Sequence, residues 1–116
     1  MPRESKSYDL VSDAALHSLN RLGARLREAR LRRNWTQAET AEKAGLSDSS
    51  VKKVEAGSAR ITIGAYLSLL DVFGLPTAFN CVLLAGEDTL GEALSRSSLR
   101  QRARQSVTAA EEDWEI

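Results

Sequence analysis

TQAETAEKAGLSDSSVKKVEAG, residues 36–57, contains two short helical patterns that a single Gly-Leu-Ser separates. Thr36 is a good N-cap residue, and Glu39 three positions later completes the pattern of a capping box. Gly45 can end this helix in a left-handed conformation, and Ser47 can cap the next helix. Two helices joined through a glycine in this way cannot be collinear. We therefore expect the second helix to cross the first at a steep angle.

Helices that cross in this way form a helix-turn-helix, in which the first helix lies across a DNA backbone and the second enters the major groove. The small side chains of Ala38, Ala41 and Ala44 are expected to face the core, and Val51 and Val54 anchor the second helix from below. The outward side chains of the second helix can hydrogen-bond to bases or phosphates. Four residues make up this outward set: Asp48, Ser49, Lys52 and Lys53.

A longer helical pattern precedes this stretch. From Ser12 or Asp13, leucines recur at spacings of three and four residues to about Arg33, which predicts one apolar stripe. Gly23 weakens the middle of the pattern, so the helix could instead begin near Leu19.

Two further patterns follow the stretch. Thr62 can cap a helix that ends at Gly74. Residues 76–84 are interpreted as a fifth short helix, although their alternating apolar side chains fit a strand equally well. The single cysteine, Cys81, lies in this segment and is expected to be a small buried apolar residue.

The length of 116 residues is enough for one domain with tails. We expect an N-terminal arm or helix extension over residues 1–18, a helix-turn-helix domain over 19–84, and a polar, largely disordered tail over 85–116. The net charge is zero, but residues 22–74 carry nine Lys/Arg against six Asp/Glu, whereas residues 75–116 carry four Arg against seven Asp/Glu. A basic middle of this kind is typical of proteins that bind nucleic acid.

The composition argues against several other classes of protein. A single cysteine excludes an intramolecular disulfide. One cysteine and one histidine, far apart in the sequence, also argue against a zinc site. The sequence shows no nucleophile–base pair, carboxylate dyad or glycine-rich phosphate loop, so we expect no enzyme and no cofactor. The polar start and the lack of a long apolar run predict no secretion signal and no membrane span, and hence a cytoplasmic protein.

Residues 22–57, LGARLREARLRRNWTQAETAEKAGLSDSSVKKVEAG, closely resemble the Xre/Cro/cI-like repressor family. The shared pattern is an Arg in the first helix, a Thr-Gln pair, a Gly turn, and a final Val-x-x-hydrophobic-Glu-x-Gly. The resemblance extends over about residues 22–74. It implies an all-α, five-helix, lambda-repressor-like fold with flexible tails, and a transcriptional repressor that binds double-stranded DNA as a homodimer.

The resemblance also implies roles for individual residues. Gln37 is expected to bind a phosphate and to orient the reading side chains. Arg30 and Glu55 match a structural ion pair that ties the first helix to the end of the third, and Arg33 and Arg60 could add phosphate contacts. Five residues match positions that face bases and nearby phosphates: Ser47, Asp48, Ser49, Lys52 and Lys53.

Two residues depart from the family pattern. Thr40 stands where the family usually has Leu, which costs about 1 kcal/mol or more if the buried hydroxyl lacks a partner. Asp48 places a negative charge at a reading position, where it could accept a hydrogen bond from a cytosine amino group or could simply cap the helix.

The C-terminal third leaves several interpretations open. Dimer contacts are expected from Leu75 to Leu84, whose apolar content exceeds what a five-helix monomer needs. Trp114, in an acidic segment, could pack within the chain or anchor a partner protein. The arginines of the tail form either a solvated segment or a second DNA contact; they are Arg96, Arg100, Arg102 and Arg104.

The tail TLGEALSRSSLRQRAR, residues 89–104, also resembles the ends of small Xre-type regulators encoded beside HipA-type kinase toxins. This resemblance implies an alternative function. The protein would then be an antitoxin that binds and neutralises a HipA-like kinase toxin and represses its own operon.

Overall fold

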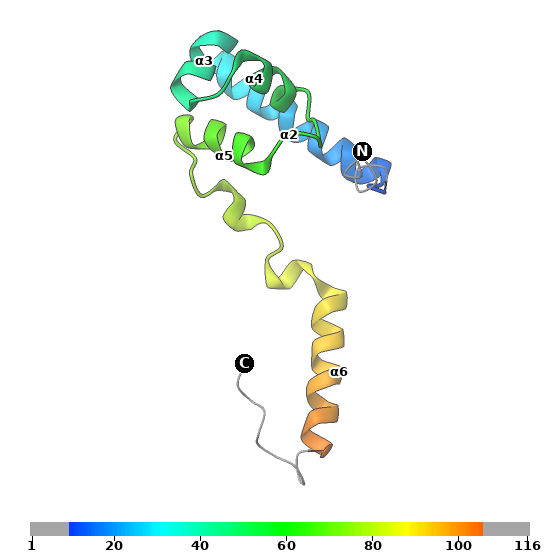
Figure 1. Ribbon diagram of the computed structural model, residues 1–116. Helices are drawn as coiled ribbons and strands as arrows, with labels where there is room; N and C mark the ends of the chain where they lie inside the picture. The colour runs from blue at the N-terminus through cyan, green and yellow to red at the C-terminus, as the bar shows by residue number, and fades with distance from the viewer. Residues whose placement is uncertain (1–9, 106–116) are drawn as a thin grey trace. The chain divides into compact units, whose positions relative to one another are not determined.

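The computed structural model describes residues 10–105, with the side chains at 85 and 105 excepted, and every element in this range is helical (Figure 1). The α-helices are α2 (Asp13–Arg32), α3 (Gln37–Ala44), α4 (Asp48–Glu55), α5 (Ile63–Val72) and α6 (Thr89–Gln105). The short 3-10 helices are η1 (Ala78–Cys81) and η2 (Ala85–Glu87). The expected all-α fold class is confirmed, and the described range contains no strand.

The chain divides into two compact units, residues 1–78 and residues 79–116, which we call the N-terminal unit and the C-terminal unit. Helices α2 to α5 belong to the N-terminal unit, and α6 belongs to the C-terminal unit. The core of the N-terminal unit is formed by side chains that these four helices contribute. Its most deeply buried members are Leu26, Thr40, Ala41, Val51, Val54, Tyr66 and Leu69.

Helix α2 runs without interruption from its cap at Ser12, whose hydroxyl accepts a hydrogen bond from the Ala15 N–H at 3.1 Å. The possibility that this helix begins near Leu19 is therefore wrong. Gly23 is buried, and a Cβ added there would lie 2.6 Å from the carbonyl oxygen of Val54. The glycine is present because the last turn of α4 lies against α2, not because the helix is interrupted.

A second glycine completes this close approach from the other side. Gly57, just after α4, has φ +72°, a left-handed conformation that glycine adopts without steric cost. A Cβ at Gly57 would lie 2.5 Å from the Cα of Asn20 in α2. Because Gly23 and Gly57 have no side chains, α2 and the end of α4 pack with their main chains almost touching at these two positions.

The helix α3 confirms part of the predicted pattern. Ala41 is buried and Ala44 is half-buried, whereas Ala38 is exposed, so its expected place in the core is wrong. At about 100° per residue, Ala38 lies roughly 160° around the helix from Thr40. The departure at Thr40 has a compensation, because the fully buried hydroxyl donates a 2.9 Å hydrogen bond to the Thr36 carbonyl.

Helix α5 closes the core with a buried aromatic side chain. Tyr66 is 2% exposed, and its hydroxyl donates a 2.7 Å hydrogen bond to the carbonyl of Ser58 in the loop before α5. Burial raises the pKa of the Tyr66 phenol, because the apolar surroundings disfavour the phenolate. The bond fixes the loop that connects α4 to α5.

The C-terminal third differs from expectation in three ways. The fifth helix expected over residues 76–84 is only the 3-10 helix η1, and Leu83 has φ +62°, which a right-handed helix cannot include. Cys81 is exposed, so its expected burial is wrong. The tail is not largely disordered over Thr89–Gln105, which form α6. The carboxylate of Asp88 accepts a 3.1 Å bond from the Gly91 N–H and so caps that helix.

Candidate nucleic-acid interface

The turn between α3 and α4 is built as its residue types predict. At the start of α3, the Glu39 N–H donates to the Thr36 hydroxyl at 3.0 Å, and the Thr36 N–H donates to the Glu39 carboxylate at 2.8 Å. This reciprocal pair is the expected capping box. At the end of α3, Gly45 has φ +70°, and the Leu46 N–H reaches back to the Ala41 carbonyl at 2.9 Å. The chain therefore leaves α3 in a fixed direction.

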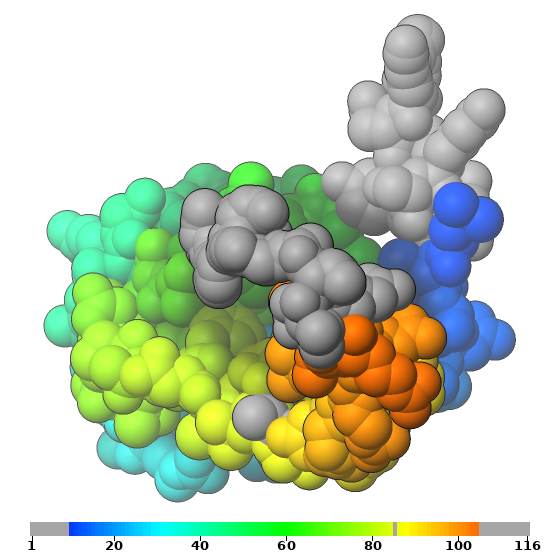
Figure 2. Space-filling model, turned by 90° about the horizontal axis from the view of Figure 1, so that it is seen from below, coloured from blue at the N-terminus to red at the C-terminus, as the bar shows by residue number. Residues whose placement is uncertain are grey.

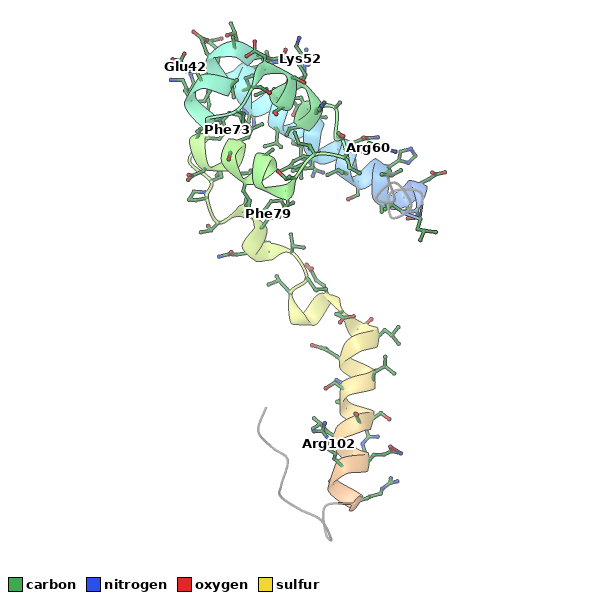
Figure 3. All side chains as sticks on the ribbon, in the orientation of Figure 1. Glu42, Lys52, Arg60, Phe73, Phe79 and Arg102 are labelled. Atoms are coloured by element: carbon green, nitrogen blue, oxygen red, sulfur yellow. The ribbon has the colours of Figure 1, made fainter. Side chains whose placement is uncertain are left out.

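The next helix, α4, separates a buried face from an exposed one. Ser47 caps it by accepting a 3.0 Å hydrogen bond from the Ser50 N–H. Val51 and Val54 are 0% exposed and hold the inner face. The outer side chains are all exposed, and we call them the reading face: Asp48, Ser49, Lys52 and Lys53. Figure 3 shows Lys52 projecting outward from α4.

Asp48 has no role as a side-chain cap, because the Ser47 hydroxyl fills that position. Asp48 is instead the first helical residue of α4 and is exposed. A carboxylate in the first turn interacts favourably with the helix dipole. Its side chain remains accessible from outside the molecule.

A buried ion pair fixes the far end of α4. The Arg30 Nε lies 2.6 Å from Glu55 Oε2, and Arg30 Nη2 donates to Glu55 Oε1 at 3.1 Å. Both side chains are almost enclosed, at 8% and 4% exposure. The third arm of the guanidinium, Nη1, donates to the Trp35 carbonyl at 2.9 Å. This two-point contact is the planar geometry in which arginine binds a carboxylate most strongly.

Gln37 belongs to the same network. Its amide Nε2 donates to Glu55 Oε1 at 3.0 Å, so this carboxylate joins side chains from α2 and α3. Gln37 is the first residue of α3 and is half-buried. Because one carboxylate at the end of α4 is held from two other helices, the three helices keep a fixed mutual orientation.

Arg33, expected to contact phosphate, is occupied inside the N-terminal unit. Its Nη1 donates to the Ala29 carbonyl and its Nη2 to the Phe73 carbonyl, each at 2.8 Å. The guanidinium carbon also lies 4.9 Å from the centre of the Phe73 ring. These contacts give Arg33 a structural role at the end of α2.

The Phe73 ring also forms an aromatic stack with Trp35. The Trp35 ring lies 5.8 Å from the Phe73 ring, and the Lys43 ammonium lies 4.9 Å from the Trp35 ring. Trp35 is half-buried rather than fully enclosed. The stack joins the turn after α2 to the ends of α3 and α5.

The remaining site residues lie apart from α4 or outside the described range. Arg60 is exposed in the loop between α4 and α5, where Figure 3 labels it, and its N–H donates to the Ser58 hydroxyl at 3.0 Å. Trp114 lies outside the described residues. Within the described range, no group of three metal-ligating side chains occurs, and no helix is both long and apolar enough to cross a membrane.

Sequence reasoning missed two contributors to the geometry of this interface. Gly23 and Gly57 allow α4 to approach α2. The signal for Gly23 was an isolated glycine inside a helical pattern, which can have a packing reason, whereas Gly57 follows the end of its helix and looks like an ordinary stop. The hydrogen bond between Gln37 and Glu55 has no local signal, because 18 positions separate the two residues.

Comparison with known proteins agrees with this architecture. A family model described as a helix-turn-helix domain matches residues 21–78, which is half of the chain. The matched region contains α3, α4 and the reading face. A search of curated proteins found no match.

Proposed function

Because the chain belongs to the helix-turn-helix domain family, in its Xre/Cro-like group, we propose that it is a sequence-specific transcriptional repressor that acts as a homodimer. The observation that carries the proposal is the division of α4. Two valines at 0% exposure hold one side of the helix, and two exposed lysines stand on the other. A helix held in this way can enter the major groove with its outer side chains against the base edges.

The reading face supplies both signs of charge. Lys52 and Lys53 can donate to guanine O6 and N7 or to backbone phosphates, and Ser49 can donate or accept. Asp48 is repelled by phosphates, so it fits a position against a base, where it would accept from a cytosine amino group. These four side chains give the interface its sequence preference.

The N-terminus of α3 supports a phosphate contact beside α4. The first N–H groups of a helix have no acceptor within it and favour an anion. At α3 these positions are Gln37 and Ala38, and Ala38 is exposed with the smallest side chain that keeps helical preference. A small side chain there leaves the backbone open to a phosphate. The hydrogen bond that Gln37 donates to Glu55 holds the Gln37 side chain in place at this end of α3.

A homodimer would place two copies of α4 in successive major grooves, about 34 Å apart, on a near-palindromic site. We propose that residues 75–84 supply the contacts, as their composition suggests. Four apolar side chains of this segment are between 49% and 74% exposed: Leu75, Val82, Leu83 and Leu84. Because these side chains are already partly covered, burial of each one against a second copy would stabilise the dimer by about 1–2 kcal/mol.

The test is the double substitution Lys52→Glu with Lys53→Glu, compared with Arg21→Glu with Arg25→Glu. Both pairs reverse two exposed positive charges, but the arginines lie on the outer face of α2. Duplexes selected from a random library by the native chain serve as the probe. The lysine pair should lose selective binding, while the arginine pair retains it. Equal loss in both variants would mean that only net charge matters, and the proposal would fail.

A second candidate function is favoured by the exposed leucines of the C-terminal unit. Leu90, Leu94 and Leu99 are 69%, 61% and 56% exposed on α6, which offers apolar surface to another protein. An antitoxin that neutralises a HipA-like kinase toxin would use such a surface. In that case the Lys52→Glu, Lys53→Glu chain would still bind the kinase and rescue growth, although it no longer binds DNA.

A further inference from the structure

The C-terminal helix α6 carries a row of arginines on one side. Arg96, Arg100 and Arg104 are spaced four residues apart. At about 100° per residue, three such positions fall within roughly 80° of the helix surface and extend over about 12 Å of its length. We call these three residues the arginine row. Arg102 lies well away from it, about 160° around the helix from Arg100.

The arginine row is exposed, and no acidic residue accompanies it. Every residue from Ala93 to Arg104 is exposed, and the last acidic residue of α6 is Glu92 in its first turn. Between residues that the structure describes, no ion pair involves an arginine of α6. The end of this helix, orange in Figure 2, forms part of the surface in that view.

The helix dipole explains why arginines gather near the end of α6, but not why three of them share one side of the helix. Cations are favoured near the C-terminus of any helix, whichever side they occupy. Three of the four arginines nevertheless share one side. An all-arginine row without lysine also suits phosphate, because a guanidinium can contact two phosphate oxygens at once.

We propose that the arginine row is a second DNA-binding surface, which contacts the phosphate backbone of a duplex without reading its sequence. This inference rests on the proposed DNA binding and extends it to the C-terminal unit. Duplex DNA carries about one negative charge per 1.7 Å of its axis, so a row of about 12 Å meets several phosphates. The row therefore adds affinity, while selectivity stays with α4.

The experiment measures how the affinity of the full chain for a short duplex depends on salt. Each phosphate contact contributes about −0.9 to the slope of log affinity against log salt. The triple substitution Arg96→Gln, Arg100→Gln, Arg104→Gln should make the slope shallower by about 2.7. Between about 50 and 200 mM salt, the native chain should lose about 40-fold more affinity than this variant.

Three further variants serve as controls. The substitutions Arg21→Gln, Arg25→Gln and Arg32→Gln remove the same charge from the outer face of α2 and should leave the slope unchanged. Arg102→Gln tests the other side of α6 and should also leave it unchanged. Replacement of the arginine row by lysines keeps its charge and should preserve most of the slope, provided that circular dichroism shows the same helix content.

The second surface is overturned if the salt slope is unchanged in the arginine-row variant, or if it changes equally in the α2 variant. If the native chain still prefers the duplexes that it selects, the proposed sequence reading stands. A native chain that binds all duplexes equally, but whose slope falls as expected in the arginine-row variant, refutes the proposed sequence reading and supports the second surface. If the arginine-row variant loses affinity for single-stranded RNA but not for duplex DNA, the second DNA-binding surface is refuted, because the ligand of the arginine row is then a different nucleic acid.

Discussion

Replacement of Gly23 by Ala tests whether α2 and α4 touch through their backbones. In an exposed helix this substitution stabilises the protein by about 1 kcal/mol, because alanine has the higher helix propensity. Here the added Cβ would lie 2.6 Å from the Val54 carbonyl oxygen and 2.7 Å from the Gly57 nitrogen. Non-bonded carbon atoms do not approach backbone atoms so closely, and rotation of a side chain cannot relieve the clash. The end of α4 must move away.

The magnitude follows from two opposing effects. Overpacking of a tight contact costs about 1–3 kcal/mol, and the upper end applies because all three close atoms belong to the backbone. Helix propensity returns about 1 kcal/mol. We expect Gly23→Ala to lower the free energy of unfolding by about 2 kcal/mol, which lowers Tm by roughly 8–16 °C for a domain of this size.

The matched control is Gly64→Ala in α5. Gly64 is also helical and exposed, and an added Cβ would meet only the Thr62 hydroxyl at an ordinary 3.7 Å. This variant should be as stable as the native chain or slightly more stable. Thermal and urea unfolding, followed by circular dichroism, measure both. A Gly23→Ala chain as stable as the native one would refute the close approach, and with it the reason for the glycine.

Two further predictions concern buried polar groups. Arg30→Met leaves the Glu55 carboxylate buried without its cation and should lower the free energy of unfolding, measured in urea, by about 3–5 kcal/mol. The double variant Arg30→Met, Glu55→Leu removes the buried charge as well and should recover much of this stability. A double variant no more stable than the single one would contradict the reasoning. Burial raises the pKa of Tyr66 above its ordinary value of 10.0, so the unfolded chain loses the phenol proton at a lower pH than the folded one. The stability that the buried phenol contributes is therefore complete below pH 10 and is lost as the pH rises toward the folded-state pKa. Tyr66→Phe removes this titration and should flatten the fall in stability at alkaline pH. Identical alkaline profiles for the native chain and Tyr66→Phe would exclude this effect.

The parts of the fold that depend on residues close together in the chain could be predicted from the sequence. The capping box at Thr36, the left-handed turn at Gly45 and the cap at Ser47 each need only a few residues in a fixed order, and each is confirmed. The exposed and buried sides of α4 follow equally from periodicity. The resemblance to the repressor family added the Arg30–Glu55 pair, which spans 25 positions and has no local signal.

The parts that failed depend on contacts between distant residues or on weak local preferences. Gly23 looked like a weak point because propensity is local, whereas its reason is the end of α4 on the other side of the contact. Arg33 looked free to bind phosphate, but the Phe73 carbonyl, 40 positions away, accepts its hydrogen bond. Helix α6 was expected to be largely disordered because its apolar pattern is faint. Most of its residues are nevertheless good helix formers, and Asp88 caps it.

The anchoring of α4 at Glu55, Val51 and Val54 has a consequence for how such a protein could acquire new targets. Val51 and Val54 pack on its inner side, Ser47 caps its start and Glu55 accepts hydrogen bonds at its end, so the four outward side chains take no part in holding the helix. The surface that α4 presents can therefore change by substitution at four positions while the fold that carries it stays the same.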